Sequence, residues 1–198
     1  MTTRARAVQE TRTRIMDACI ALHGERLVAD IGLDDIAGRA GVTVQTLLRH
    51  FGSRAGLLDA VSVRAETVVV EERRAPVGDV REAVRVIVDH YEERGDQVLL
   101  MLAQESHEEL MRRITERGRA LHRAWVVEVF GPYLTHAHDA HEADELTDLL
   151  AVVTDVYVWK LLRRDRGLSR AETELRMRDL VSALLPPNPT DAALAPVH

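Results

Sequence analysis

Apolar residues recur every three or four positions along most of this chain, and this spacing restricts its fold more than any other feature. Such a period lines apolar side chains along one face of an α-helix, whereas half-buried strands alternate every second residue. We find no alternating stretch, no internal repeat and no heptad array. Aromatic residues make up only 4% of the chain, and sheets favour them. The pattern therefore predicts an all-α protein.

The apolar period divides the chain into segments separated by glycine, proline or polar connections. The predicted helices cover residues 10–22, 33–40, 44–51, 54–71, 79–93, 98–103, 108–134, 142–166 and 169–185. We expect Gly95 to separate the helices over 79–93 and 98–103, and Gly131 with Pro132 to bend or end the helix over 108–134. Ser169, with Glu172 three residues later, has the pattern of a capping box at the start of the last helix.

Composition and charge limit the class of protein. The single cysteine, Cys19, cannot form an internal disulfide, and we see no signal peptide or membrane-spanning run, so a cytoplasmic protein is expected. The net charge of −6 is unevenly distributed. Residues 1–60 carry eight arginines and seven acidic residues, whereas the rest carries 18 basic and 25 acidic residues. The N-terminal third is thus the only part whose charge suits contact with phosphate.

The most informative stretch is LDDIAGRAGVTVQTLLRHFGSRAGLL, residues 33–58. Gly41 stands where the first short helix would end in a left-handed residue, and Thr43 is a suitable N-cap for the second. Gly52 would end that helix, and Ser53 would cap the next. Two short helices joined by a glycine-containing turn present the second helix as a rod that fits the major groove of DNA. The stretch therefore predicts a helix-turn-helix.

This stretch also resembles the signature of the tetracycline-repressor (TetR) family of transcriptional regulators. The resemblance rests on Ile36-Ala37, Ala40-Gly41-Val42, Thr46-Leu47, His50-Phe51, Ser53-Arg54 and Leu57-Leu58. It covers about a quarter of the chain and implies a three-helix DNA-binding domain over residues 1–58. A larger helical effector-binding and dimerisation domain would follow over 59–187, and we expect a disordered tail over 188–198.

The resemblance implies which side chains contact DNA. The residues concerned are Thr43, Val44, Gln45, Thr46, Leu48, Arg49, His50 and Arg54. Gln45 can hydrogen-bond a base edge, and the methyl groups of Val44 and Thr46 can contact thymine. Arg54 matches a residue that contacts phosphate in the family.

Three positions depart from the family pattern. Leu48 replaces a tyrosine that would hydrogen-bond a phosphate, so that contact is lost or becomes apolar. Leu27 stands where a glycine would close the first helix, and a leucine would be strained in the left-handed region. Gly32 replaces a Thr or Ser cap, at a cost of a few tenths of a kcal/mol. These departures change individual backbone contacts and leave the motif recognisable.

The predicted helix over 142–166 is apolar on more than one side, so it must be covered on more than one side. Its own chain would cover one side and a second copy another, and the last helix would join it in a four-helix interface of a homodimer. The alternative is a single buried core helix in a monomer.

The C-terminal region is larger than dimerisation needs, which favours a small-molecule effector site. The candidate ligand-binding residues are Tyr91, Met101, Leu102, Glu105, His107, His122, Trp125, Val152, Asp155 and Trp159. Asp155 is the most unusual, because it interrupts an apolar run. It would anchor a polar or cationic ligand, or else have an arginine or backbone partner in the core or interface.

No cofactor and no metal are expected. His136, His138 and His141 lie close together in a polar connection, but their spacing matches no closed metal site. We find no phosphate loop, nucleophile elbow or paired carboxylates, so an enzyme is not predicted. The predicted function is a DNA-binding regulator, a repressor released from a palindromic operator by a small molecule. The alternatives are an activator and a helical module that binds a small molecule without DNA.

Overall fold

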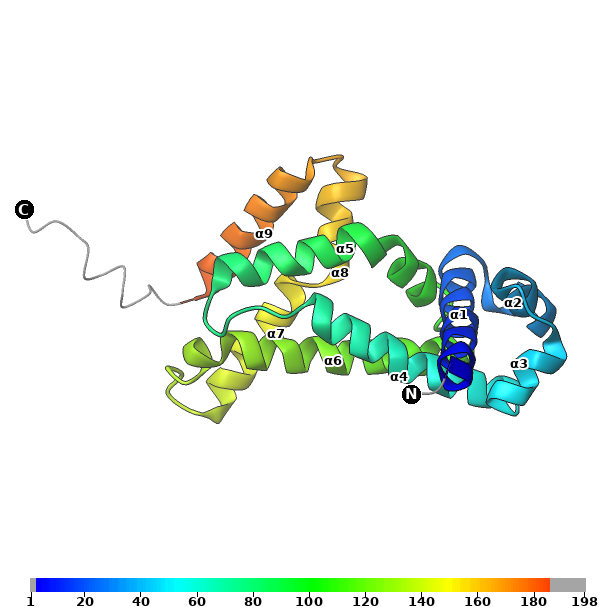
Figure 1. Cartoon of the computed structure of the whole chain (residues 1–198). Coiled ribbons are helices and arrows are strands. Elements are labelled where there is room, and N and C mark those ends of the chain that lie inside the picture. Colours follow the sequence, from blue (N-terminus) through cyan, green and yellow to red (C-terminus); the bar gives the residue numbers. More distant parts are fainter. Residues whose placement is uncertain (1–2, 186–198) are drawn as a thin grey trace, which may run out of the picture. The chain divides into compact units, whose positions relative to one another are not determined.

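A computed structural model of the chain describes residues 3–185, and over this range the regular secondary structure is helical, with no strand (Figure 1). The all-α prediction is thus confirmed. The helices are α1 (Thr3–Glu25), α2 (Leu33–Ala40), α3 (Val44–Phe51), α4 (Arg54–Glu72), α5 (Val80–Leu102), α6 (Glu109–Leu134), α7 (Ala140–Val153), α8 (Val156–Lys160) and α9 (Arg170–Leu184). A 3-10 turn covers Val28–Asp30, and a π turn covers Leu161–Asp165. None of the helices in residues 3–185 has both the length and the apolar character of a membrane span.

The described chain packs as two compact units. Unit 1 contains residues 3–71 and 96–116, and unit 2 contains residues 72–95 and 117–185. These units reflect packing alone, so the functional boundary after residue 58 stays a prediction. The predicted tail over 188–198 lies outside the described residues.

The core of unit 1 beneath the helix-turn-helix is a cluster of buried apolar side chains from α1, α2, α3 and α4. Its members are Ile15, Met16, Ala18, Cys19, Leu22, Ile31, Ile36, Ala37, Ala40, Leu47, Phe51 and Leu57. Within the predicted first helix, the apolar side chains spaced three or four positions apart are the buried ones, namely Ile15, Ala18, Cys19 and Leu22. Burial raises the pKa of the Cys19 thiol to about 11, so it remains protonated and packs as a small apolar group.

The bounds of α2 and α3 are those predicted from the sequence, because both helices are ended by local signals. Gly41 has a φ of +67° and Gly52 a φ of +76°, conformations that a side chain would strain. Thr43 caps α3 by accepting a hydrogen bond from the Thr46 N–H at 3.1 Å. Ser53 caps α4 by accepting one from the Gly56 N–H at 3.1 Å.

The turn between α1 and α2 avoids the strain expected at Leu27. Leu27 has a φ of −62° in extended backbone, and α1 ends two residues earlier, at Glu25. Gly32 is the N-cap of α2, as predicted, and its N–H donates to Asp35 Oδ2 at 2.8 Å. The Gly32 N–H and the Arg26 guanidinium together lower the pKa of the Asp35 carboxyl.

The predicted break at Gly95 is wrong, since α5 is continuous from Val80 to Leu102. A Cβ on Gly95 would lie 2.5 Å from a ring carbon of Trp159. The missing side chain of Gly95 therefore makes room for the indole of Trp159, which lies 64 positions later in the chain. Nothing in the local sequence indicates that contact.

The prediction of one helix over 142–166 is also wrong. α7 ends at Val153, and Asp155 caps a new short helix, α8, by accepting a hydrogen bond from the Tyr157 N–H at 2.8 Å. Thr and Asp side chains compete with helical backbone bonds, and here they end one helix and begin another. The surrounding apolar run concealed this break. Gly167, with a φ of +69°, closes the segment as predicted.

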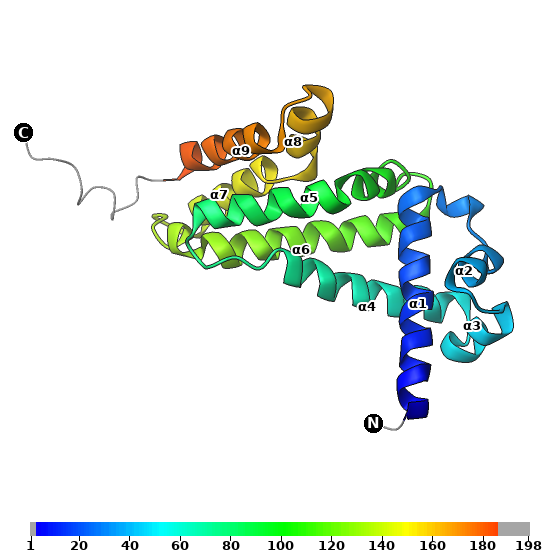
Figure 2. The ribbon, with the colours of Figure 1, turned by 45° about the horizontal axis from the view of Figure 1, so that its top comes forward.

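The predicted bounds of α6 are confirmed, since it ends at Leu134; Gly131 and Pro132 do not end the helix, which continues through them for two more residues. In Figures 1 and 2 the part of α6 in unit 2 runs beside the part of α5 in the same unit.

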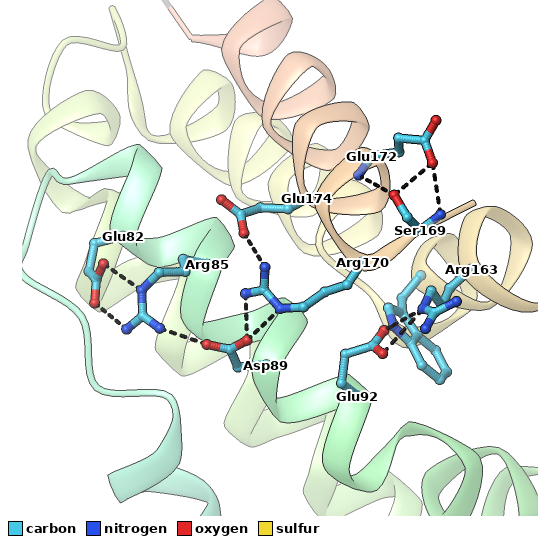
Figure 3. A network of polar contacts seen from close by, with 10 residues as sticks. Glu82, Arg85, Asp89, Glu92, Arg163, Ser169, Arg170, Glu172 and Glu174 are labelled. Atoms are coloured by element: carbon cyan, nitrogen blue, oxygen red, sulfur yellow. Dashed lines mark hydrogen bonds and ion pairs between the residues drawn. The ribbon is translucent and has the colours of Figure 1, made fainter. Parts of the chain in front are cut away.

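A network of ion pairs connects α9 to α5 within unit 2 (Figure 3). Arg170 contacts Asp89 of α5 and Glu174 of its own helix, each at 2.8 Å. Arg85 lies between Glu82 and the other oxygen of Asp89. At the start of α9, Ser169 and Glu172 form the predicted capping box. Exposed pairs of this kind contribute little stability individually, so their main effect is to orient α9.

Candidate nucleic-acid interface

Helix α3 has one buried face and one exposed face. Leu47 is fully buried (0% exposed) and Phe51 packs beside it in the core, whereas the adjacent Leu48 is 37% exposed. Gln45 and Arg49 lie on the exposed side as well. The helix is therefore anchored through its apolar side and presents its other side to solvent.

The polar side chains at the N-terminal end of α3 are not equally available. The Thr43 hydroxyl accepts from the Thr46 N–H and is 3.0 Å from the Thr46 hydroxyl, so both hydroxyls already take part in the cap. Their methyl groups remain for contact with a base. The amide of Gln45, which can donate and accept, projects from an exposed position at the second residue of the helix.

Arg12 supports the C-terminal end of α3, a role that the sequence does not indicate. Its Nη1 donates to the carbonyl oxygen of His50 at 2.8 Å, and its guanidinium lies 4.3 Å from the centroid of the Phe51 ring. A cation at this position satisfies a terminal carbonyl and stabilises the helix dipole. Arg6, by contrast, pairs with Glu10 at 3.0 Å, so the basic N-terminus is not wholly available to phosphate.

Two ion pairs connect α2 and its preceding turn to the end of α1. Arg39 contacts Glu25 at 2.5 Å, and Arg26 contacts Asp35 at 3.0 Å. The hydrogen bond from Arg39 lowers the pKa of the Glu25 carboxyl. Acidic groups beside the helix-turn-helix are thereby neutralised by neighbours, while Arg49 and Arg54 stand exposed on α3 and at the start of α4.

This geometry coincides with a known family. Residues 15–61, which include α2, α3 and the start of α4, match the model described as bacterial regulatory proteins, tetR family. Residues 15–61 are therefore the N-terminal DNA-binding region of the TetR family, and the resemblance predicted from the sequence is confirmed for this part of the chain. That family consists of DNA-binding transcriptional regulators and is non-enzymatic.

The fold beyond the family match is also found in solved structures. A TetR-family regulator from Streptomyces coelicolor has a TM-score of 0.66 and 17% identity over 89% of this chain and 80% of its own. A putative TetR-family regulator from Rhodococcus sp. has a TM-score of 0.61 and 19% identity, over 88% and 98%. The multidrug binding protein EbrR, complexed with imidazole, has a TM-score of 0.57 and 20% identity, over 90% and 91%. No curated protein sequence matches the chain.

The candidate effector residues do not all lie in one unit. Unit 1 contains Met101, Leu102, Glu105 and His107, whereas unit 2 contains Tyr91, His122, Trp125, Val152, Asp155 and Trp159. Glu105 accepts a hydrogen bond from the Thr115 hydroxyl at 2.5 Å. Their roles in ligand binding stay predictions.

Five of the unit 2 candidates are brought together in its interior. The Tyr91 and Trp159 rings are 6.0 Å apart, and the His122 and Trp125 rings stack at 5.7 Å. Thr154, which the sequence analysis passed over, connects these pairs: its carbonyl accepts from the Tyr91 hydroxyl at 3.0 Å, and its hydroxyl is 3.1 Å from His122 Nε2. Asp155 is partly buried beside them.

Val152 is the exception, because it is 62% exposed in the single chain. It shares this exposure with large apolar residues of the same region, namely Leu149, Tyr157 and Leu161. Its position suits an interface better than an interior ligand site.

A groove of about 460 Å³ lies in unit 1. It is lined by Arg12, Met16, Ala60, Val63, Arg64, Thr67 and Val68. None of the ten candidate effector residues lines it. Among the described residues, the buried polar atoms without a partner include those of Arg73 and His122 in unit 2 and none of the groove's side chains.

The three loop histidines are exposed and are not gathered around a common point. His138 contacts Glu142 at 2.7 Å, and His141 lies 3.4 Å from Glu145. Within residues 3–185, no group of three or more His, Cys, Asp or Glu side chains has an arrangement suited to a metal ion.

Proposed function

We propose that this TetR-family regulator is a repressor that binds a near-palindromic operator as a homodimer and is released by a small molecule. The observation that carries the DNA part is the division of α3 into a buried face and an exposed face, seen at Leu47 and Leu48. A rigidly held helix with an exposed outer face is what major-groove reading requires. Because its target would be chromosomal DNA, we infer that it acts in the cytoplasm.

In this proposal Gln45 reads a base edge, and the methyl groups of Val44 and Thr46 contact thymine. Arg49, His50 and Arg54 contact phosphates or bases farther along the groove, and Thr43 approaches the backbone at the start of the helix. Leu48, exposed at the tyrosine position of the family, makes an apolar contact with sugar or a thymine methyl.

The homodimer is supported by apolar side chains that a single chain leaves exposed. Those of α7 to α9 are Leu149, Val152, Tyr157, Leu161, Leu175 and Leu180. Exposed apolar patches of soluble proteins commonly mark interfaces. A four-helix arrangement of α7 and α9 from two subunits would cover them.

The effector part is supported by the interior cluster in unit 2 and by the position of α4. This helix starts immediately after the helix-turn-helix and ends at Glu72 in unit 2, where Arg94 and His90 bind the Glu72 carboxylate at 2.7 and 2.8 Å. A ligand that favours one tilt of α4 would change the separation of the two recognition helices. The ligand releases DNA if its affinity is higher for the arrangement that cannot bind DNA than for the arrangement that can.

The test begins with selection of bound sequences from random duplex DNA by the full chain. The selected site should be near-palindromic, with half-sites about one helical turn apart, ~34–36 Å. Light scattering should then give a dimer, and the double variant Val152→Glu/Leu161→Glu should give a monomer with weaker operator binding. Val77→Glu, also at an exposed valine of unit 2, is the matched control and should change neither.

A stable monomer, both alone and on the selected duplex, would contradict the homodimer. Failure to enrich any sequence would favour the helical module that binds a small molecule without DNA. Placing the selected site relative to the promoter distinguishes a repressor from an activator.

A further inference from the structure

Unit 2 contains a buried arginine that forms no ion pair with a carboxylate among the described residues. Arg73 is only 8% exposed, and its Nε–H has no hydrogen-bond partner among the described residues. Its guanidinium lies 5.6 Å from the centroid of the Tyr91 ring. A buried polar group without a partner is costly, and a buried charge is more so, hence such a group calls for an explanation.

No hydrogen-bonded carboxylate pairs with the Arg73 guanidinium among the described residues. The adjacent Glu72 accepts hydrogen bonds from Arg94 and His90 instead. The Asp155 carboxyl accepts from the Tyr157 N–H as the cap of α8, and the Arg73 charge acts on it only through space. Asp155 thus balances part of the Arg73 charge, and the Nε–H of Arg73 stays without a partner.

His122 supplies a second buried group without a partner, its Nδ1. Its Nε2 is 3.1 Å from the carbonyl oxygen of Ala151, which can only accept, so Nε2 carries the proton. The Thr154 hydroxyl donates to the Leu150 carbonyl at 2.7 Å and therefore also accepts from this Nε2–H. Burial and the Arg73 charge lower the pKa of His122 to about 4, so the ring is neutral near pH 7 and Nδ1 is an acceptor.

Arg73 and His122 are connected through Trp125. The Trp125 Nε1–H donates to the carbonyl oxygen of Arg73 at 2.7 Å, and its ring stacks on His122 with an interplanar angle of 16°. The Trp125 indole therefore contacts the backbone of Arg73 and the ring of His122, while the Arg73 guanidinium lies beside the ring of Tyr91.

We propose that the effector is an organic acid with one carboxylate and a nearby hydroxyl or N–H group. The carboxylate accepts from the Arg73 guanidinium, the hydroxyl or N–H donates to His122 Nδ1, and an apolar body packs against Tyr91 and Trp125. This proposal rests on the proposed function and specifies its ligand. One buried arginine balances a single negative charge, which favours a carboxylate over a doubly charged phosphate.

Entry of such a ligand requires the packed cluster to open. The break between α7 and α8 lies at Thr154 and Asp155, and Thr154 contacts both Tyr91 and His122. A small shift of α8 about this break would open the cluster from one side.

The test measures binding of matched acids and amides to the full chain by isothermal titration calorimetry. The probes are 3-hydroxy-2-naphthoate, 2-naphthoate and 2-naphthamide, with decanoate and decanamide for an aliphatic body. Each acid that binds should do so at least about ten-fold more tightly than the matching amide, because only the acid gains a charge-assisted hydrogen bond. The hydroxyl of the first probe should improve affinity over 2-naphthoate.

Variants locate the effect. Arg73→Gln should reduce the ratio of acid affinity to amide affinity to near one. If circular dichroism shows that Arg73→Gln does not fold, Arg73→Lys takes its place and should retain part of that ratio. His122→Phe keeps a ring beside Trp125 and should remove only the advantage of the hydroxyl. Arg81→Gln, at an exposed arginine of α5, should change nothing.

Three results would each overturn the proposal. The amides could bind as tightly as the acids, or the acid-to-amide affinity ratio could stay unchanged in both Arg73 variants. The third is that no acid binds at millimolar concentration. Operator binding, measured separately by fluorescence anisotropy, distinguishes failure of the proposed effector class from failure of the proposed function. If a neutral compound releases the operator and acids do not bind, the proposed function stands and the effector class is wrong. If no duplex is bound, the proposed function itself fails.

Discussion

The core beneath α3 and the interior of unit 2 differ in chemistry. The core beneath α3 is formed by apolar side chains from Ile15 to Leu57, with one buried histidine, His23, beside Cys19. The interior of unit 2 holds a buried arginine as well as two buried histidines, namely Arg73, His90 and His122. The first region is built to hold an exposed helix still, whereas the second also keeps a charged side chain away from water. In the function proposed above, the same chain would read DNA with its surface and a small molecule with its interior.

The adjacent leucines of α3 test the first half of this comparison. Leu47→Ala should cost roughly 2–5 kcal/mol of unfolding free energy, since it removes a fully buried side chain and leaves a cavity. Leu48→Ala, at an exposed position of the same helix, should change stability by no more than about 0.5 kcal/mol. Denaturant melts followed by circular dichroism measure both, and equal losses would mean that α3 is not anchored on one side.

Substitutions on the exposed surface of α3 and α4 should distinguish side chains that recognise bases from side chains that bind phosphates. Gln45→Ala should relax base preference at one position of each half-site and cost on the order of 1–3 kcal/mol of binding free energy. Arg54→Ala should weaken binding to all sequences similarly and make its salt dependence shallower. Anisotropy titrations on the selected operator and its single-base variants distinguish them. If both variants lower only overall affinity, Gln45 does not read a base.

The buried histidines of unit 2 should make its stability depend on pH. His122 has a pKa lowered from the ordinary 6.5 to about 4, and His90 one lowered to about 3, both mainly by burial. The unfolded chain binds more protons below pH 6.5, so stability is fully present above that pH and is lost as the pH falls towards 4. At pH 5 the loss from His122 alone should be about 2 kcal/mol.

Thermal melts at pH 7.5 and pH 5.0 measure this loss. His122→Phe should reduce the difference between them, and His141→Gln, at an exposed histidine, should leave it unchanged. A pH response that is the same in all three proteins would place the titrating groups outside this interior.

Packing inside unit 2 gives the smallest expected effect. Gly95→Ala should lower the free energy of unfolding by about 1 kcal/mol, because contact with Trp159 outweighs the better helix propensity of alanine. Gly118→Ala, in α6 with nothing within 4 Å of its Cβ position, should instead raise it by up to about 1 kcal/mol. Should both alanines stabilise the protein, the close approach of Trp159 to α5 is wrong.

The sequence by itself determined the helical class, the family and the bounds of α2 and α3. Those bounds depend on residues that act on their own backbone, namely Gly41, Thr43, Gly52 and Ser53. The capping box at Ser169 was predictable for the same reason. Each signal involves a φ angle or a hydrogen bond between residues at most three positions apart, so a single sequence contains all the information required.

Only the tertiary structure decided the continuity of α5, the break between α7 and α8, and the buried cluster around Arg73. Gly95 belongs inside a helix because Trp159 approaches it, and Thr154 ends α7 where its polar groups contact Tyr91 and His122. Arg73 looks like an ordinary surface arginine until Trp125 and Tyr91 enclose it. The partners of these residues lie 18 to 64 positions away in the sequence, and packing energies between such distant segments are not contained in any local pattern.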